Sequence, residues 1–166
     1  YKEGRVVAAV CVGRDITQRK LTEEALKSTE DHYRLVFENT TDGIYIVYKD
    51  LSVTVLTPAF GKLTGFTPEK AAGSKLEKFE FWTQETLQPA VSDLQRVFSG
   101  ETIPSSEYKL ITMDGADLYL DVSSSPLIKD GEVVGAICVA RDVTGRKLAE
   151  QKLAGSEEKY RTLMDN

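Results

Sequence analysis

The residues that could do chemistry are few, and they are not arranged as a catalytic site. The chain contains a single histidine, His32, and two cysteines, Cys11 and Cys138. Covalent catalysis by serine or cysteine needs a base, usually histidine, beside the nucleophile. A phosphate-binding loop needs clustered glycines, whereas the glycines of this chain are isolated. We therefore predict no catalytic residue, no metal ligand set and no enzymatic activity in this chain.

Both cysteines belong to a sequence repeat that relates the two ends of the chain. Residues 4–39 align with residues 131–166 at a constant offset of 127, and 18 of the 36 aligned positions are identical. Cys11 and Cys138 are thus one structural position seen twice. We interpret them as plain strand thiols in a reducing, cytoplasmic compartment. His32 aligns with Lys159, which indicates a solvated position and not a metal or catalytic one.

A repeat of this length is typical of one module that recurs in tandem. We expect residues 1–14 to be the last strand of a preceding unit and residues 15–30 to be a linker helix. Residues 31–144 then form one complete domain, and residues 145–166 form a second linker helix and the start of the next unit. The chain is therefore expected to be part of a relay with adjacent units and a downstream output domain.

Composition excludes two classes of partner. The net charge is −5 and the isoelectric point is about 5.0, with no basic patch, so nucleic acid is not an expected partner. The longest apolar run, at residues 6–12, has seven residues. A membrane-spanning helix needs about 20, so we expect no membrane contact by this segment.

The elements that must position the remaining side chains follow from periodicity and turn signals. We predict strands at 43–48, 53–57, 103–112, 117–127 and 132–141, and helices at 15–39, 58–64, 68–72 and, as the longest in the domain, up to 98. If Gln88 caps this long helix, Pro89 lies in its first turn; if Thr83 caps it, Pro89 lies inside and should bend it. Asp-Gly turns at 114–115 and 130–131 indicate hairpins. The order predicts an α+β fold with a five-stranded antiparallel sheet and helices on one face.

The last strand, 132–141, is apolar on both faces. Ile137 and Val139 point one way, whereas Ala136, Cys138 and Ala140 point the other. Both faces of such a strand are normally covered. One face must meet the core of the domain, and the other needs a linker helix or a partner subunit.

The first linker helix carries a heptad-like seam of Thr22, Leu26, Thr29, Tyr33 and Val36. Two interpretations stay open. The helix packs on its own domain, or it pairs with a second copy through Leu26, Tyr33 and Val36. In the second case we expect a homodimer that also uses the N-terminal strand at residues 6–12, since an exposed apolar strand would otherwise aggregate.

Three segments resemble the PAS domain and its C-terminal PAC segment. Residues 33–44 are similar to the family's opening helix and first strand, and residues 57–73 to its helical motif. Arg141-Asp142-Val143-Thr144, which is repeated at residues 14–17, resembles the family's D-x-T junction. The usual Asn of the helical motif is Thr57 here, so this helix start is expected to be tied differently. The resemblance implies a PAS fold within a multi-PAS sensor of a two-component system, such as a prokaryotic sensory histidine kinase.

The resemblance also implies what cofactors to expect. Haem-binding members need a histidine on the long helix, and covalent flavin photosensors need a cysteine in the short helices; both are missing here. We therefore expect no cofactor, with a non-covalent flavin or a small apolar ligand as the alternative. The candidate pocket lies between the sheet and the short helices. Its candidate liners are Phe60, Phe66, Trp82, Leu94, Tyr108, Leu120 and Ile137.

The favoured function is a non-enzymatic sensory, signal-relay and dimerisation module. The repeated junction places Asp142 and Thr144, like Asp15 and Thr17, between a strand and a charged helix. Asp and Thr side chains accept hydrogen bonds from free N–H groups where helices begin. A shift of the sheet would therefore move the linker helix through this junction. The alternative function is a small-molecule or flavin-binding sensor domain.

Overall fold

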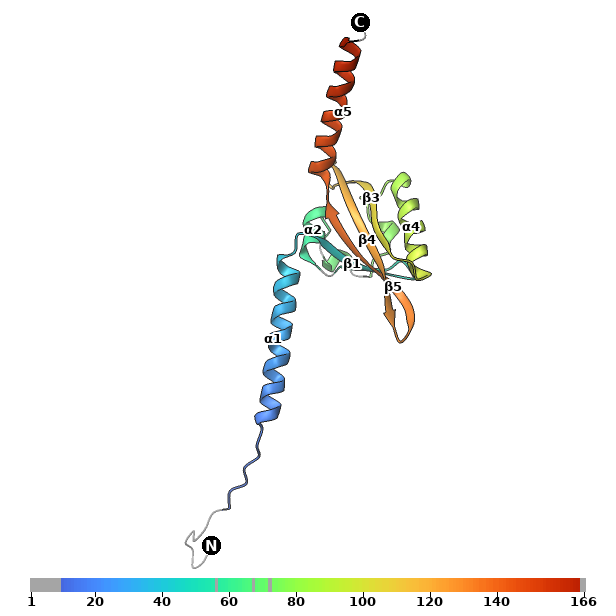
Figure 1. Cartoon of the computed structure of the whole chain (residues 1–166). Coiled ribbons are helices and arrows are strands. Elements are labelled where there is room, and N and C mark those ends of the chain that lie inside the picture. Colours follow the sequence, from blue (N-terminus) through green and yellow to red (C-terminus); the bar gives the residue numbers. More distant parts are fainter. Residues whose placement is uncertain (1–9, 56, 67, 72, 165–166) are drawn as a thin grey trace, which may run out of the picture. The chain divides into compact units, whose positions relative to one another are not determined.

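The computed structural model describes residues 10–55, 57–66, 68–71 and 73–164. Two strands, a group of helical segments and three further strands lie between two long helices along the chain (Figure 1). In order they are α1 (Thr17–Asn39), β1 (Gly43–Tyr48), β2 (Val53–Val55), α2 (Pro58–Thr64), α3 (Pro68–Ala71), the 3₁₀ helix η1 (Leu76–Lys78), α4 (Gln84–Phe98), β3 (Ile103–Ile111), β4 (Asp117–Lys129), β5 (Glu132–Asp142) and α5 (Thr144–Met164). The chain divides into two compact units between Val36 and Phe37, within α1.

The five strands form one antiparallel sheet in the order β2-β1-β5-β4-β3. The last strand in sequence, β5, therefore lies at the centre. It pairs with β1 from Gly43 opposite Ala140, and with β4 up to Leu120 opposite Asp142. The predicted α+β fold with a five-stranded antiparallel sheet is confirmed.

The hairpin between β4 and β5 turns on two residues with positive φ, Asp130 (52°) and Gly131 (82°). Two consecutive left-handed residues make the turn whose twist matches paired strands. The Asp-Gly signal in the sequence thus marks the true end of β4. It fixes which residues of β4 and β5 lie opposite each other.

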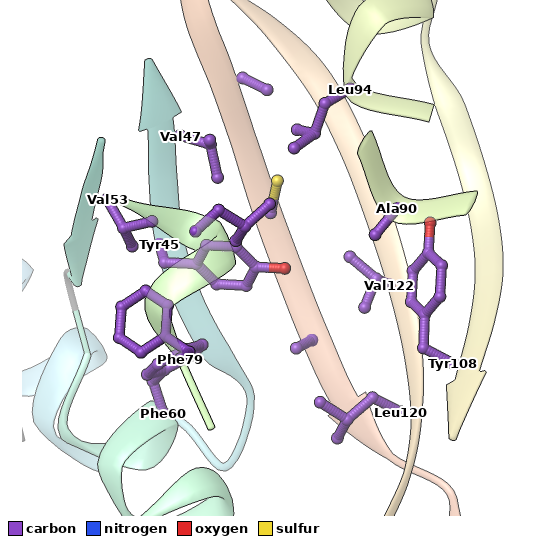
Figure 2. Packing of buried hydrophobic residues seen from close by; sticks show 14 of the residues in the cluster. Tyr45, Val47, Val53, Phe60, Phe79, Ala90, Leu94, Tyr108, Leu120 and Val122 are labelled. Carbon is purple, nitrogen blue, oxygen red and sulfur yellow. The ribbon is translucent and has the colours of Figure 1, made fainter. Parts of the chain in front are cut away.

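The core lies between the sheet and the helical segments α2 to α4. Alternate residues of the strands face it, among them Tyr45, Val47, Val122 and Cys138, because neighbouring side chains of a strand point to opposite faces. Phe60 of α2 packs against Tyr45 with ring centroids 4.9 Å apart (Figure 2). Further aromatic rings and the apolar side of α4 close this face of the sheet.

Helix α4 begins at Gln84 and is capped by Thr83, the second of the two capping residues that the sequence allows. Thr83 and Thr86 form a capping box, in which the Thr83 N–H donates to Thr86 Oγ1 at 3.2 Å. Pro89 consequently lies inside the helix. The helix ends before Gly100, whose φ is 102° and whose N–H donates to the carbonyl of Val97.

Helix α1, at Thr17–Asn39, lies within its predicted bounds of 15–39. Helix α1 runs without a break across the expected boundary at residues 30–31. The predicted strand at 6–12 falls mainly on residues 1–9, which lie outside the described part of the chain, and residues 10–16 form neither helix nor strand. Within the described residues, no helix combines the length and apolar character that crossing a bilayer requires.

Candidate functional site

The junction between β5 and α5 is built from the residues that the repeat had singled out. Val143 separates the end of the strand from the first helical residue, Thr144. The Thr144 N–H donates to Oδ1 of Asp142 at 2.8 Å, and the Lys147 N–H donates to the carbonyl of Val143 at 3.0 Å. Asp142 therefore satisfies an N–H group that the helix itself leaves free. We call residues Asp142, Val143 and Thr144 the α5 joint.

The α5 joint is bonded to strand β4 through Tyr119. The Tyr119 N–H donates to Oγ1 of Thr144 at 3.0 Å, and its carbonyl accepts from the Val143 N–H at 2.9 Å. Both backbone groups of Tyr119 are thus used by the joint. The hydrogen bond to the Thr144 hydroxyl extends the pairing of β4 with β5 beyond the last residue of β5. The first residue of α5 is therefore fixed to the sheet.

Basic side chains of the first turn of α5 also reach the sheet. Arg146 contacts Glu107 of β3 at 2.8 Å, and Lys147 forms an ion pair with the same carboxylate. Lys147 and then Arg146 hold the pKa of Glu107 below its ordinary value. One turn further on, Gln151 Nε2 donates to the hydroxyl of Tyr119 at 3.3 Å. The first two turns of α5 are therefore held by two neighbouring strands, β3 and β4.

The residue before β1 is bonded to the end of β5, next to the α5 joint. Arg141, the residue before the α5 joint, contacts Asp42 through Nε–Oδ1 at 3.2 Å and Nη2–Oδ2 at 2.8 Å. The fully buried Thr57 donates to the Asp42 carbonyl at 3.0 Å and accepts from the Ile44 N–H at 2.8 Å. Thr57 does not cap α2 with its side chain, so this helix start is tied through β1.

The N-terminal copy of the junction repeats only the local part of this geometry. The Thr17 N–H donates to Oδ1 of Asp15 at 2.9 Å, as Thr144 does to Asp142, and this contact lowers the pKa of Asp15. Arg19, the counterpart of Arg146, pairs with Glu23 of its own helix at 2.8 Å. The helix start is therefore encoded locally, whereas the contacts to a sheet are made only by the second copy among the described residues.

The predicted dimer seam lies on a helix that buries none of its residues, all of which the structure describes. Leu26, Tyr33 and Val36 are 60%, 63% and 68% exposed. Their counterparts Leu153 and Tyr160 on α5 are exposed to the same extent. Both helices thus carry apolar side chains that the described chain leaves in solvent.

A small cavity of about 20 Å³ lies between β1, β4, β5 and α4. Trp82, Leu94 and Tyr108, three of the predicted pocket residues, line it. Phe60 and Leu120 are buried in the core but do not line the cavity, and Phe66 packs on the rings of Phe79 and Phe81. Ile137 is half-buried and lies on the opposite face of β5, because its neighbours Ala136 and Cys138 face the core.

Asp93, which also lines the cavity, is a residue that the sequence did not single out. Tyr108 and Ser106 each donate a hydroxyl hydrogen bond of 2.6 Å to Oδ2 of Asp93. Burial would raise the pKa of Asp93, but these bonds and the Arg96 ion pair hold it below its ordinary value. Asp93 lies between Ala90 and Val97 on the buried side of α4, and that spacing is the signal that could have identified it.

Two further polar groups border the same cavity. Burial raises the pKa of the Cys138 thiol to about 11, and its sulfur accepts from the Ser124 hydroxyl at 3.4 Å. Among the described residues, Nε1 of Trp82 is a buried nitrogen without a hydrogen-bond partner. A cavity of this size holds about one water molecule, so a single small acceptor could satisfy that nitrogen.

Comparison with known proteins identifies what this arrangement is similar to. A family model described as "PAS fold" matches residues 37–148, more than half of the chain. A PAS domain of a protein from Colwellia psychrerythraea superposes with a TM-score of 0.60 at 16% identity, covering 70% of this chain and 98% of that one. At that identity the likeness concerns the fold alone.

Two curated bacterial proteins match over most of the chain. The probable diguanylate cyclase DgcE of Escherichia coli is 24% identical over 152 residues, covering 90% of this chain and 14% of that protein. The signal transduction histidine-protein kinase AtoS of Escherichia coli is 26% identical over 137 residues, covering 81% of this chain and 21% of that protein. The chain thus spans about a fifth or less of the length of these relatives.

Proposed function

Since this chain belongs to the PAS family, whose domains are sensory and non-catalytic modules, we propose that it relays a conformational change from its sheet to α5 through the α5 joint. The observation that carries the proposal is the pair of hydrogen bonds that the backbone N–H and carbonyl of Tyr119 make with the α5 joint. A strand that shifts must move the residues bonded to it. The first turn of α5 therefore follows β4.

The ion pairs at Glu107 also support transmission of a conformational change from the sheet to α5. They add β3 to the contacts of α5, so two neighbouring strands position one helix. Beyond Gln151, every residue of α5 from Lys152 to Arg161 is exposed. A helix that is fixed at one end and free along the rest converts a small change at the sheet into a larger displacement at its far end.

The two curated relatives suggest what lies downstream. One is named a histidine kinase and the other a diguanylate cyclase, and each is far longer than the matched segment. We propose that this module likewise acts on a separate output domain through α5. The recurrence of the junction at Asp15 and Thr17 supports a tandem arrangement with adjacent units of the same kind.

We further propose that the linker helices form a homodimer. The exposed apolar side chains Leu26, Tyr33 and Val36 recur at 3- and 7-residue spacings, which is the pattern of a helix that pairs with another helix. The half-buried outer residues of the sheet, Ile137 and Val139, offer a second apolar surface. A dimer would cover both without a change in the fold of residues 37–144.

A second candidate function, binding of a small ligand, is favoured by one observation. The unpartnered Trp82 Nε1 and the polar lining of the cavity would suit a small hydrogen-bond acceptor. Pockets for drug-sized ligands measure about 300–1,000 Å³. A flavin does not fit the 20 Å³ cavity in this conformation, which supports the relay over a flavin sensor. An absorption spectrum and native mass of the freshly purified chain distinguish the two functions.

The relay proposal is tested by amide hydrogen exchange along α5. Thr144→Val removes the hydroxyl that binds Tyr119, whereas Thr144→Ser keeps it and serves as the matched control. We expect faster exchange in the first two turns of α5 in the valine variant only, with the core of the sheet unchanged. Equal exchange in both variants would show that the joint does not hold α5, and the proposal would fail.

A further inference from the structure

The Asp42–Arg141 pair links the two places where the chain enters and leaves the domain. Asp42 lies three residues after the end of α1 and directly before β1. Arg141 lies directly before Asp142 of the α5 joint. Gly43 pairs with Ala140 in the ladder of β1 and β5, which places Asp42 and Arg141 opposite each other at its end. The end of α1 and the start of α5 are therefore connected through residues 40–42, one side-chain contact and residues 141–143.

The geometry of the pair is that of a two-point contact and not of a loose surface ion pair. Both guanidinium atoms, Nε and Nη2, reach different oxygens of the same carboxylate. Such a fork fixes orientation as well as distance. The Asp42 side chain is 18% exposed and that of Arg141 is 69% exposed, so the carboxylate is held in the domain and the arginine reaches toward it.

The Asp42 side of the pair is rigidly supported. The buried Thr57 hydroxyl bonds the Asp42 carbonyl and the Ile44 N–H, and the Thr57 N–H donates to the Ile44 carbonyl at 3.2 Å. Asp42 cannot move without disturbing this set of bonds. On the other side, Asp121 lies opposite Arg141 in β4, but its Oδ1 accepts from Ser105 at 2.6 Å. Among the described contacts, Asp42 is the carboxylate that binds Arg141.

We propose that Asp42 and Arg141 are positioning residues that couple the end of α1 to the α5 joint directly, without passing through the core. The inference rests on the proposed relay and adds its input side. A displacement of residues 37–42 pulls on Arg141 through the two-point contact. Because Asp142 is the next residue, the displacement changes the start of α5. Signals from a preceding helix would then reach α5 even when the core of this domain is unchanged.

The test perturbs the end of α1 and reads the start of α5 in the full chain. Glu38→Gly loosens the last turn of α1, and amide exchange of residues 144–147 is measured with and without Asp42→Asn. We expect Glu38→Gly to accelerate exchange of these amides about two- to fivefold, the range of a surface ion-pair coupling. We expect no such acceleration in the Asp42→Asn background and a restored effect with Asp42→Glu.

The Asp50–Lys75 pair provides a matched control, because it also joins two segments at the surface with a contact of 2.7 Å. Asp50→Asn should leave the effect of Glu38→Gly on α5 unchanged. An effect that persists undiminished in Asp42→Asn, or that never reaches residues 144–147, would overturn the inference. If Thr144→Val still frees α5 in that case, the relay stands and only the input route is wrong.

Discussion

The hydroxyl of Thr144 accepts a hydrogen bond from the backbone N–H of Tyr119, so the first residue of α5 belongs structurally to the sheet. The same threonine donates its own N–H to Asp142. One short side chain and one carboxylate thus convert the end of a strand into the start of a helix. The same Arg-Asp-x-Thr sequence recurs at residues 14–17, where the Thr17 N–H donates to Asp15 in the same way.

The two copies of the junction should respond differently to the same substitution. Asp142→Ala removes the acceptor of the Thr144 N–H, which should fray the first turn of α5 and lower the Tm of the domain by a few degrees. Asp15→Ala removes the same local bond in α1 and should leave the Tm unchanged, because that copy makes no described contact to the sheet. Circular dichroism melting compares the two, and an equal change in Tm would contradict this account of the joint.

The two cysteines should differ sharply in reactivity. Cys11 is exposed, whereas Cys138 is buried with a pKa of about 11. At pH 8 only about one in a thousand Cys138 side chains is a thiolate, and the thiolate is the reactive form. We expect native protein to react with one equivalent of iodoacetamide and unfolded protein with two. Native Cys11→Ser should not react; rapid labelling of that variant would show that the core opens readily.

The ionised carboxylate of Asp93 should stabilise the folded domain at neutral pH, and this contribution should be lost in acid. Its pKa in the folded state is lowered below 3.8, so its contribution is present above the unfolded pKa and is lost as pH falls through the folded value. Its facing groups, Tyr108 and Arg96, stay protonated in that range. Asp93→Asn should destabilise the domain at pH 7 by about 1 kcal/mol, with a shallower loss of stability below pH 4. Urea unfolding from pH 2 to 7 measures both, and parallel profiles would refute the assignment.

The proposed homodimer is tested by a substitution that introduces a charged side chain into the seam of α1. Leu26→Lys should convert a dimer into a monomer, because a charge at an apolar position of paired helices would be buried without a partner. Ile128→Lys, which changes a side chain of similar exposure on the β4–β5 hairpin, is the control. Sedimentation velocity reports the mass. If the wild-type protein is a monomer, or if the Leu26→Lys variant still dimerises, the seam of Leu26, Tyr33 and Val36 is not the dimer interface.

Local signals in the sequence predicted the elements well. Pro58 and Gly65 bound α2, and the two residues with positive φ at 130–131 form the hairpin turn that Asp-Gly indicated. The start of α4 was ambiguous, because two polar residues could cap it and only the Thr83–Thr86 contacts decide between them. The 3₁₀ helix η1 was missed because three residues are too few to show a period.

Contacts between residues far apart in the chain could not be predicted from the sequence. Both faces of β5 are apolar, so its pattern cannot say whether Ile137 or Cys138 faces the core; the packing of α4 against that sheet face decides it. Asp42 and Arg141 are 99 residues apart, and the sequence around each of them contains no signal that predicts their contact. The role of Asp93 depends on hydroxyls that β3 brings to it from a distance in sequence.

The most direct test of the relay is transmission from the core to α5. Tyr108→Phe removes a bond to Asp93 in the core and lies next to Glu107, which binds Arg146 and Lys147. Amide exchange of residues 144–151 is measured for Tyr108→Phe alone and together with Glu107→Gln and Thr144→Val. The account predicts that Tyr108→Phe changes this exchange only while the contacts of α5 to the sheet are intact. An unchanged α5 in Tyr108→Phe, or the same change after those contacts are removed, would contradict it.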